Sequence, residues 1–389
     1  MSKIKRMEKF EKSLNSRCDM LGADLFCGAG GFSLAATRAG FRIAISCEKN
    51  THACATYRKN IEAGRHESHL IEGDITQFSP QELMRHAGLE PGELDIVIGG
   101  PPCQGFSVHN PQNRHSRDKR NLLVLTYLDL VEQMRPKFFL IENVPGLLRE
   151  SHRWVLETIR QRATKAGFIV EHPIVLNARD FGIPQNRQRV FILARRKGIS
   201  LPEKWPPAPT HFAPDSKEVL VCGLPAWRPA RVVFDRPLAS SDPENRHMKP
   251  GPVLAAVFAA TPLDGGSRHE SGRTLACHAT HNGHRDVYGR IDTARPGPTM
   301  TTACVNPSKG RFVHPWENHG ITVRHAARLQ SFPDDFLFSG GLTAAGEQIG
   351  NAVPPELGYA VLQPIAEYLT KLKGQRINKK DNLARTIAA

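Results

Sequence analysis

The sequence of 389 residues contains no uninterrupted apolar run of about 18 residues, the length that a membrane-spanning helix needs. Its opening stretch, MSKIKRMEKFEK, lacks the apolar centre of a secretory signal peptide. The eight cysteines are scattered singly, with no CxxC pair and no regular spacing. These absences argue against a disulfide framework and favour a cytoplasmic protein with reduced thiols, one of which is then available as a nucleophile.

Acidic residues are outnumbered, because 52 Lys and Arg face 38 Asp and Glu and give a formal charge of +14. Each Lys or Arg that neutralises a phosphate releases counterions, so this excess favours a polyanionic partner such as nucleic acid. The alternative is a basic surface that serves solubility alone. With 40% hydrophobic residues, the chain can bury a large core and a smaller one.

From residue 20 to about 196, short apolar runs alternate with longer amphipathic ones, a pattern typical of a parallel sheet wrapped by helices. Helical periodicity covers residues 122–134 and 154–166. The expected strands are 22–26, 41–47, 94–98, 138–142, 169–176 and 189–194. The fold class is therefore α/β, with one doubly wound and mostly parallel sheet.

The texture changes near residue 200, where LPEKWPPAPTHFAP begins a segment crowded with Gly, Pro, His and Arg. It predicts a second, smaller and irregular domain with short strands. Helical patterns return at 323–330 and 355–372, and we expect the basic tail from Lys371 to be frayed. The predicted division is 20–198 for the sheet domain, 199–338 for the irregular domain, 339–372 for a segment returning to the first domain, and 373–389 for the tail.

The run DLFCGAGGFSLA, residues 24–35, places a glycine turn between the first strand and a helix. Bare backbone there lets a ligand approach closely. The spacing departs from the GxGxxG that grips a pyrophosphate, which favours a nucleoside cofactor without phosphates. The alternative is a tight strand-to-helix connection with no ligand.

Two carboxylates follow neighbouring strands. Glu48 ends the second strand, where it can accept both hydroxyls of a ribose, and Asp74 in EGDIT follows the third, where it can accept from an adenine amino group. Solvated surface carboxylates are the alternative. Two acidic strand ends beside a glycine turn suit an adenosine moiety.

The segment GGPPCQGFS, residues 99–107, is the strongest feature of the sequence. Two prolines fix the backbone before Cys103, and the flanking glycines permit a sharp, exposed turn. Most lone cysteines are small buried hydrophobes, but this setting favours a displayed thiol. In FFLIENV, Glu142 ends a buried strand, where desolvation raises a carboxyl pKa and favours the protonated form.

Three further segments are specialised. QNRQRVF places Arg187 and Arg189 on one face of a strand, where they can clamp a phosphate or a pyrimidine oxygen, unless they are ordinary surface arginines. RHAARLQSFPD, residues 324–334, predicts a structural helix that proline stops. QIGNAVPPELG, residues 348–358, predicts a turn into a helix with prolines in its first turn.

In this order the segments resemble the DNA cytosine-5 methyltransferases of the bacterial restriction-modification type, over residues 20 to about 370. The resemblance implies the S-adenosylmethionine-dependent methyltransferase fold, with DNA in a cleft between the catalytic domain and a smaller target-recognition domain. One departure is His325, where the family usually has Glu. The cofactor-binding residues it implies are Phe26, Gly28, Gly30, Gly31, Glu48, Asp74, Pro101, Asn351 and Val353.

The implied chemistry needs a thiolate, because carbon 5 of cytosine is a poor nucleophile until something adds at carbon 6. Cys103 would add there, and Glu142 would stabilise the charge that develops on ring nitrogen 3, together with Arg187 and Arg189. A duplex hides carbon 6, so the base must first be flipped out.

The segment HNPQNRHSRDKRN, residues 109–121, is polar and aperiodic, and it resembles the family's mobile loop that closes over DNA. An ordinary solvated loop is the alternative. We expect double-stranded DNA as substrate, a restriction endonuclease of the same specificity as a partner, a monomer, and a bacterial, nucleoid-associated location. The predicted DNA contacts are Gln104, Ser107, Arg114, Arg117, Lys119 and Arg120.

Other functions explain less of the sequence. Cys277, His278, His281 and His284 invite a zinc site, but no second ligand pair follows, so no metal is expected. A nicotinamide oxidoreductase leaves GGPPCQGFS unexplained, and a silent DNA-binding module needs neither Cys103 nor Glu142. An RNA methyltransferase is the closest rival, and the long segment after residue 200 argues against it.

Overall fold

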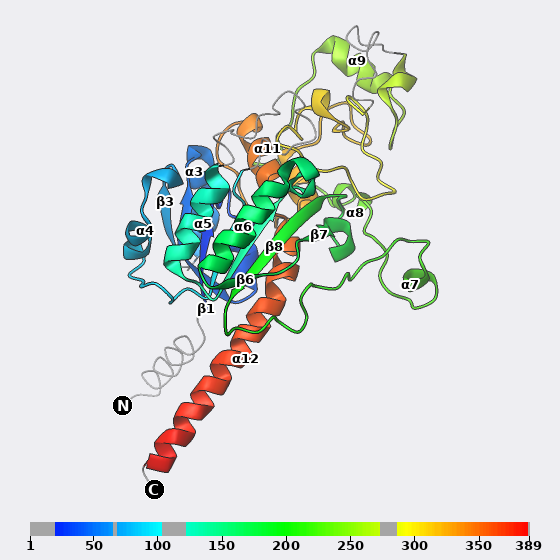
Figure 1. Ribbon diagram of the computed structural model, residues 1–389. Helices are drawn as coiled ribbons and strands as arrows, with labels where there is room; N and C mark the ends of the chain where they lie inside the picture. Colours follow the sequence, from blue (N-terminus) through cyan, green and yellow to red (C-terminus); the bar gives the residue numbers. More distant parts are fainter. Residues whose placement is uncertain (1–19, 65–67, 103–121, 273–285, 388–389) are drawn as a thin grey trace, which may run out of the picture.

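A single sheet of eight strands forms the centre of the molecule in the computed structural model, which describes residues 20–64, 68–102, 122–272 and 286–387 (Figure 1). The strands lie in the order β3-β2-β1-β4-β5-β8-β6, with β7 also paired to β8. Those from β3 to β5 are parallel, whereas β8 is antiparallel to its neighbours. The prediction of a doubly wound, mostly parallel sheet is confirmed. The strands are β1 (Met20–Leu25), β2 (Phe41–Glu48), β3 (His69–Glu72), β4 (Ile96–Gly99), β5 (Phe138–Asn143), β6 (Phe168–Val170), β7 (Ile174–Asn177) and β8 (Gln188–Arg196).

The strand order reverses between β1 and β4, because the chain leaves β1 towards β2 on one side and later returns to β4 on the other. Crevices that bind ligands in such sheets open at the carboxyl ends of the strands beside this reversal. The glycine turn follows β1 and the segment GGPPC begins at the end of β4, so both lie at this point.

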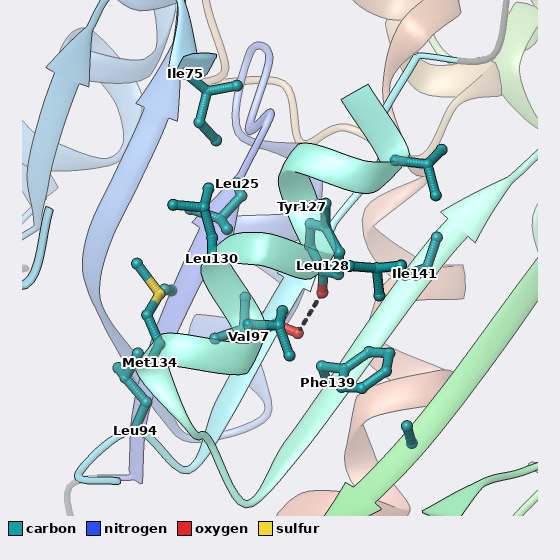
Figure 2. Close-up of a cluster of buried hydrophobic side chains, with 14 of the residues drawn as sticks. Leu25, Ile75, Leu94, Val97, Tyr127, Leu128, Leu130, Met134, Phe139 and Ile141 are labelled. Carbon is teal, nitrogen blue, oxygen red and sulfur yellow. Dashed lines mark hydrogen bonds between the residues drawn. The ribbon is translucent and has the colours of Figure 1, made fainter. Parts of the chain in front are cut away.

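Helices cover both faces of the sheet. One core cluster packs α4, α5 and α6 against one face, and Figure 2 shows Tyr127 and Leu128 of α5 lying over Val97 and Phe139 of the sheet. A second cluster packs α2 and α12 against the opposite face. The helices are α2 (Gly31–Arg38), α3 (Thr51–Asn60), α4 (Pro80–His86), α5 (Leu122–Met134), α6 (Arg153–Lys165), α7 (Lys217–Leu220), α8 (Arg231–Phe234), α9 (Pro252–Ala260), α10 (Val323–Leu329), α11 (Leu342–Asn351) and α12 (Pro355–Ile387).

A third cluster joins the two halves of the chain. It packs Cys27 and Ala29 of the glycine turn and Tyr57 of α3 with apolar residues of α8, α10 and α11. Because α11 and α12 follow the irregular segment, the chain returns to the sheet after leaving it. The glycine turn therefore packs against both the sheet and the returning chain.

The prediction of short strands after residue 200 is wrong. In the part of 199–338 that the structure describes, the regular elements are short helices, and backbone pairing of the β type is limited to isolated bridges such as Arg290 with Val313. Glycine and proline are frequent there, and neither supports a continuous ladder.

Two other predictions need correction. The expected strand 169–176 is two strands, β6 and β7, separated at Pro173, which has no N–H to donate to a ladder. The tail predicted to fray from Lys371 continues α12 to Ile387, and Figure 1 shows this helix projecting well beyond the sheet. The residues after Lys371 are mostly good helix formers without proline, so a helix already started can propagate. No described helix is both long and apolar enough to cross a membrane.

Candidate active site

The glycine turn after β1 has an unusual backbone. Phe26, Gly28 and Gly30 all have positive φ angles, of 67°, 55° and 95°. The amides of Phe26 and Cys27 donate to the carbonyl of Cys47 at the end of β2, at 3.0 and 3.1 Å. This pairing accounts for a left-handed phenylalanine, because neighbouring backbone fixes the turn.

Glu48 at the end of β2 is fixed by backbone donors. Its Oε2 accepts from the amide of Gly28 at 2.9 Å, and its Oε1 accepts from Lys49 at 2.9 Å and Asn50 at 2.8 Å. Oε1 thus uses both of its lone pairs, whereas Oε2 keeps one. The carboxylate is held in one orientation beside the turn and can accept a ligand hydroxyl at Oε2.

The three glycines differ in what surrounds them. A Cβ on Gly31 would lie 2.5 Å from the carbonyl oxygen of Val353, and one on Gly30 would lie 2.9 Å from the side chain of Ile61. A Cβ on Gly28 would meet nothing within 4 Å. The turn is therefore closed towards the returning chain and open at Gly28, as a cradle for a ligand would be. Asn351, the last residue of α11, is exposed and stands two residues before Val353 in the sequence.

Asp74 follows β3 and caps the short 3₁₀ turn after it. Its Oδ1 accepts from the amide and the hydroxyl of Thr76, at 3.1 and 2.8 Å, and Lys49 lies 3.7 Å from Oδ2. The Thr76 bonds lower the pKa of this half-exposed carboxyl, so it is ionised at neutral pH. The amide of Gly73 donates to the carbonyl of Glu48 at 2.8 Å, which keeps the two acidic strand ends together.

At the end of β4 the chain passes close to β1, because a Cβ on Gly99 would lie 2.6 Å from the carbonyl oxygen of Leu25. Pro101 is buried, and its carbonyl accepts from the side-chain amide of Asn143 at 3.2 Å. Sequence reasoning missed Asn143, although it stands in the ENV segment. The residues predicted to follow, Cys103 and the DNA contacts Gln104, Ser107, Arg114, Arg117, Lys119 and Arg120, lie outside the described residues, as do the four in CHATHNGH.

Glu142 is the last residue but one of β5 and is 8% exposed. Its Oε1 lies 2.8 Å from Nε of Arg189, while its Oε2 lies 3.1 Å from where a Cβ on Gly100 would stand. Burial raises the pKa of Glu142, and the guanidinium groups of Arg189 and Arg187 offset part of the rise. The buried carboxyl is thus aimed by an arginine and lies against Gly100, which stands three residues before Cys103 in the sequence.

The two arginines of QNRQR do not share one set of partners. Arg189 lies in β8 and pairs with Glu142, whereas Arg187 precedes the strand and is 1% exposed. The guanidinium of Arg187 donates to the carbonyls of Met300 at 2.7 Å, Gly350 at 2.7 Å and Ala352 at 3.1 Å. Arg187 therefore ties the returning segment to the sheet, and its catalytic role stays a prediction.

The reversal of the sheet, the open glycine turn and the paired acidic strand ends are typical of α/β proteins that bind a nucleoside cofactor. The model of one family, the C-5 cytosine-specific DNA methylases, matches residues 20–367. The chain belongs to this family of DNA cytosine-5 methyltransferases.

Similar proteins agree with this family. The chain is 33% identical over 350 residues to the type II methyltransferase M1.HphI of Haemophilus parahaemolyticus, covering 89% of this chain and 87% of that one. It is 31% identical to the type II methyltransferase M.DdeI of Desulfomicrobium norvegicum, covering 90% and 89%. The crystal structure assigned to a DNA modification methyltransferase of an E. coli prophage has the same fold, with a TM-score of 0.66 at 24% identity over 90% of this chain and 100% of that one.

Proposed function

We propose that the chain methylates carbon 5 of a cytosine flipped out of duplex DNA, through a covalent bond from Cys103 to carbon 6. The observation that carries the proposal is the buried Glu142, oriented by Arg189 and lying against Gly100, three residues before Cys103. A carboxyl with a raised pKa beside a nucleophile segment suits acid catalysis on a ring.

The cofactor we propose is S-adenosylmethionine, which supplies the methyl group when it is bound. The open position at Gly28 and the fixed carboxylate of Glu48 support this assignment, because they fit a nucleoside without phosphates. Asp74 is the proposed partner of the adenine amino group. The full proposed set is Phe26, Gly28, Gly30, Gly31, Glu48, Asp74, Pro101, Asn351 and Val353.

The chain's own groups move the electrons and protons of the reaction. The Cys103 thiolate adds to carbon 6, and the electron pair of the 5,6 double bond moves onto carbon 5 and towards nitrogen 3, where Glu142 donates a proton. Carbon 5 is then nucleophilic. After methylation, transfer of the proton on carbon 5 to a water molecule restores the double bond and expels the thiolate, and nitrogen 3 returns its proton to Glu142.

Arg189 is proposed to hold Glu142 in place, and Arg187 to keep the returning segment against the sheet while contributing positive charge near the ring. The remaining assignments are Gln104, Ser107, Arg114, Arg117, Lys119 and Arg120 as DNA contacts, and residues 199–338 as the domain that reads the target. The type II names of the relatives support a role in a restriction-modification system. We propose that the enzyme acts as a cytoplasmic monomer alongside an endonuclease of the same specificity.

The test is methyl transfer from labelled S-adenosylmethionine to duplex DNA and, in parallel, to tRNA. We expect transfer to DNA, its abolition in Cys103→Ala with cofactor binding retained, and a covalent complex with DNA containing 5-fluorocytosine, because fluorine cannot leave as the proton does. Cys222→Ala is the matched control, since Cys222 is an exposed free thiol. Near-normal turnover in Cys103→Ala, or transfer to tRNA alone, would overturn the proposal.

A further inference from the structure

A chain of buried hydroxyl groups lies beneath the glycine turn and ends on a carboxyl that the reaction above does not use. Asp24 of β1 is 1% exposed, and its Oδ2 accepts from the hydroxyl of Ser33 at 2.6 Å. The hydroxyl of Tyr57 donates to Ser33 Oγ at 3.0 Å. The hydroxyl oxygens of Ser46 and Ser68 lie 2.6 and 3.2 Å from that of Tyr57.

The hydrogen bonds run in one direction. Each hydroxyl has a single proton to donate. Ser33 donates to Asp24 and Tyr57 donates to Ser33. Tyr57 therefore accepts a hydrogen bond from Ser46 or Ser68. Asp24 is the terminal acceptor. Bonds aligned in this way polarise one another, which stabilises the ionised form of the group on which they converge.

The members of the chain surround the turn that we assign to the cofactor. Asp24 stands two residues before Phe26, Ser33 lies in the first turn of α2, and Ser46 stands two residues before Glu48 on β2. The N-cap of α2 is Gly30, which offers no side chain, and the carboxylate of Asp24 instead accepts from the hydroxyl of Ser33 in the first turn. The carboxyl therefore links the strand before the turn to the helix after it.

We propose that Asp24 is a positioning residue, whose ionised carboxylate holds the glycine turn and the start of α2 in the conformation that binds the cofactor. This inference rests on the proposed function, because it concerns the same cofactor site. A protonated Asp24 would hold Ser33 and α2 less firmly, since the positive end of the helix favours an anion.

The carboxyl of Asp24 changes between its protonated and ionised forms near neutral pH. Burial raises the pKa of Asp24 to about 7, the bonds from Ser33 oppose the rise, and the charge of Glu48 adds to it. The other titratable groups that face it are Cys27, Tyr57 and Tyr127, whose pKa values burial raises, so they are neutral in this range. Cofactor affinity should thus weaken as the pH falls through about 7.

The test measures cofactor binding by calorimetry and the KM for S-adenosylmethionine and kcat, each between pH 6 and 8.5. The full-length wild type should bind the cofactor several-fold more weakly at pH 6 than at pH 8. Asp24→Asn keeps the shape and removes the charge. It should raise the KM about tenfold at pH 8, the size expected for one hydrogen bond to a charged group, and should leave kcat within about twofold. Its affinity should no longer change with pH over this range.

Two more variants distinguish a role of Asp24 in cofactor binding from a general loss of stability. Tyr57→Phe retains the ring and removes one donor from the chain, so it should move the midpoint of the pH profile upward. Asp95→Asn is the matched control, because Asp95 is also 1% exposed but precedes β4 at the amino ends of the strands, away from the glycine turn, and is paired with Lys137 and Lys373. It should lower stability and leave the pH profile of cofactor binding unchanged.

A pH-independent affinity in the wild type, an unaltered profile in both Asp24→Asn and Tyr57→Phe, or the same change in Asp95→Asn would each overturn the inference. A wild type that binds no S-adenosylmethionine at any pH would instead refute the proposed function. The two failures are distinguishable because binding is measured without any methyl transfer.

Discussion

The sheet and the irregular segment after it satisfy their buried backbone groups by different means. In the sheet, strands pair with strands. In the described part of 199–322, arginine side chains take that role: Arg290 is fully buried and donates to the carbonyls of Phe258, Thr261, His314 and Glu317 and to the side-chain oxygen of Asn318. A planar group with five donors can bind several carbonyls that no ladder could align.

Other arginines repeat this arrangement. Arg311 donates to the carbonyls of Gly265, Gly266 and Arg290, and Arg328 donates to those of Val233, Arg236 and Pro237. Arg187, Arg268, Arg290 and Arg324 are among the largest fully buried side chains of the protein. Part of the formal charge of +14 is therefore internal scaffolding, and the charge available to DNA is smaller than composition suggests.

The two regions also differ in their buried titratable groups. Burial raises the pKa of Asp24 and Glu142 at the sheet, and it lowers the pKa of His247, His314 and His325 in the irregular segment and α10. The sheet thus buries acids that resist ionisation, whereas the other region buries bases that resist protonation.

The largest effect that would test this difference between the two regions is expected from Arg290→Ala. Several carbonyls would lose their donor at once, at about 1–3 kcal/mol each, so we expect the irregular segment to unfold at a total cost of about 4 kcal/mol or more. Limited proteolysis should show early cleavage between residues 199 and 322. Arg295→Ala, at a side chain 82% exposed, is the control. Equal protease resistance of both variants would mean that arginine hubs do not hold this region.

Leu140→Ala sharpens the comparison from the other side. Leu140 lies in the middle of β5 with no exposed surface, and truncation of such a side chain costs about 3 kcal/mol. Urea unfolding should shift to a lower midpoint, and cofactor binding should be lost in the same transition. Separate transitions for unfolding and for cofactor loss would contradict a cofactor site built directly on the sheet.

The pH dependence should have opposite signs in the two regions. A histidine with a lowered folded pKa contributes stability that is present above its unfolded value of 6.5 and lost as the pH falls through the folded value. Asp24, raised from 3.8 to about 7, contributes stability that is present below 3.8 and lost as the pH rises through about 7. Between about pH 4 and 6.5, acid therefore weakens the histidine region and favours the sheet.

Hydrogen exchange at pH 5.5 and 7.5, corrected for intrinsic rates, checks this contrast. Peptides from 234–247 and 312–325 should lose protection at the lower pH, and peptides from 41–48 should not. His314→Asn keeps an acceptor for the amides of Trp316 and Glu317, which bond His314 Nδ1, and should reduce the loss. A uniform response across both regions would show that the histidines do not govern it.

The smallest effect is expected at an ion pair on the sheet region's surface. Arg153 of α6 lies 3.1 Å from Glu157, with both side chains more than half exposed. Water and salt screen such pairs, so Arg153→Ala should leave the free energy of unfolding almost unchanged. A larger change in urea unfolding would count against assigning the stability of this region to its core.

Sequence reasoning succeeded where the local pattern and the tertiary role coincide. The strands that carry Glu48 and Glu142 are apolar runs because they are buried on both faces, and α12 begins at Pro355 as the proline pattern predicts. It failed where contacts come from distant residues. Nothing in QNRQR shows that Arg187 meets Gly350, or that Asp24 is the end of a hydroxyl chain from four other segments.

By itself, the sequence determined the doubly wound sheet, the glycine turn and the acidic strand ends, because periodicity and turn residues act over a few neighbouring positions. It also carried the resemblance that placed the chain in its family. Only the tertiary structure decided which arginines face inward, which of the two in QNRQR aims Glu142, and how a buried aspartate comes to hold the turn. Those outcomes depend on burial and on partners in other segments of the chain, up to the 163 residues that separate Arg187 from Gly350, and a linear pattern contains neither.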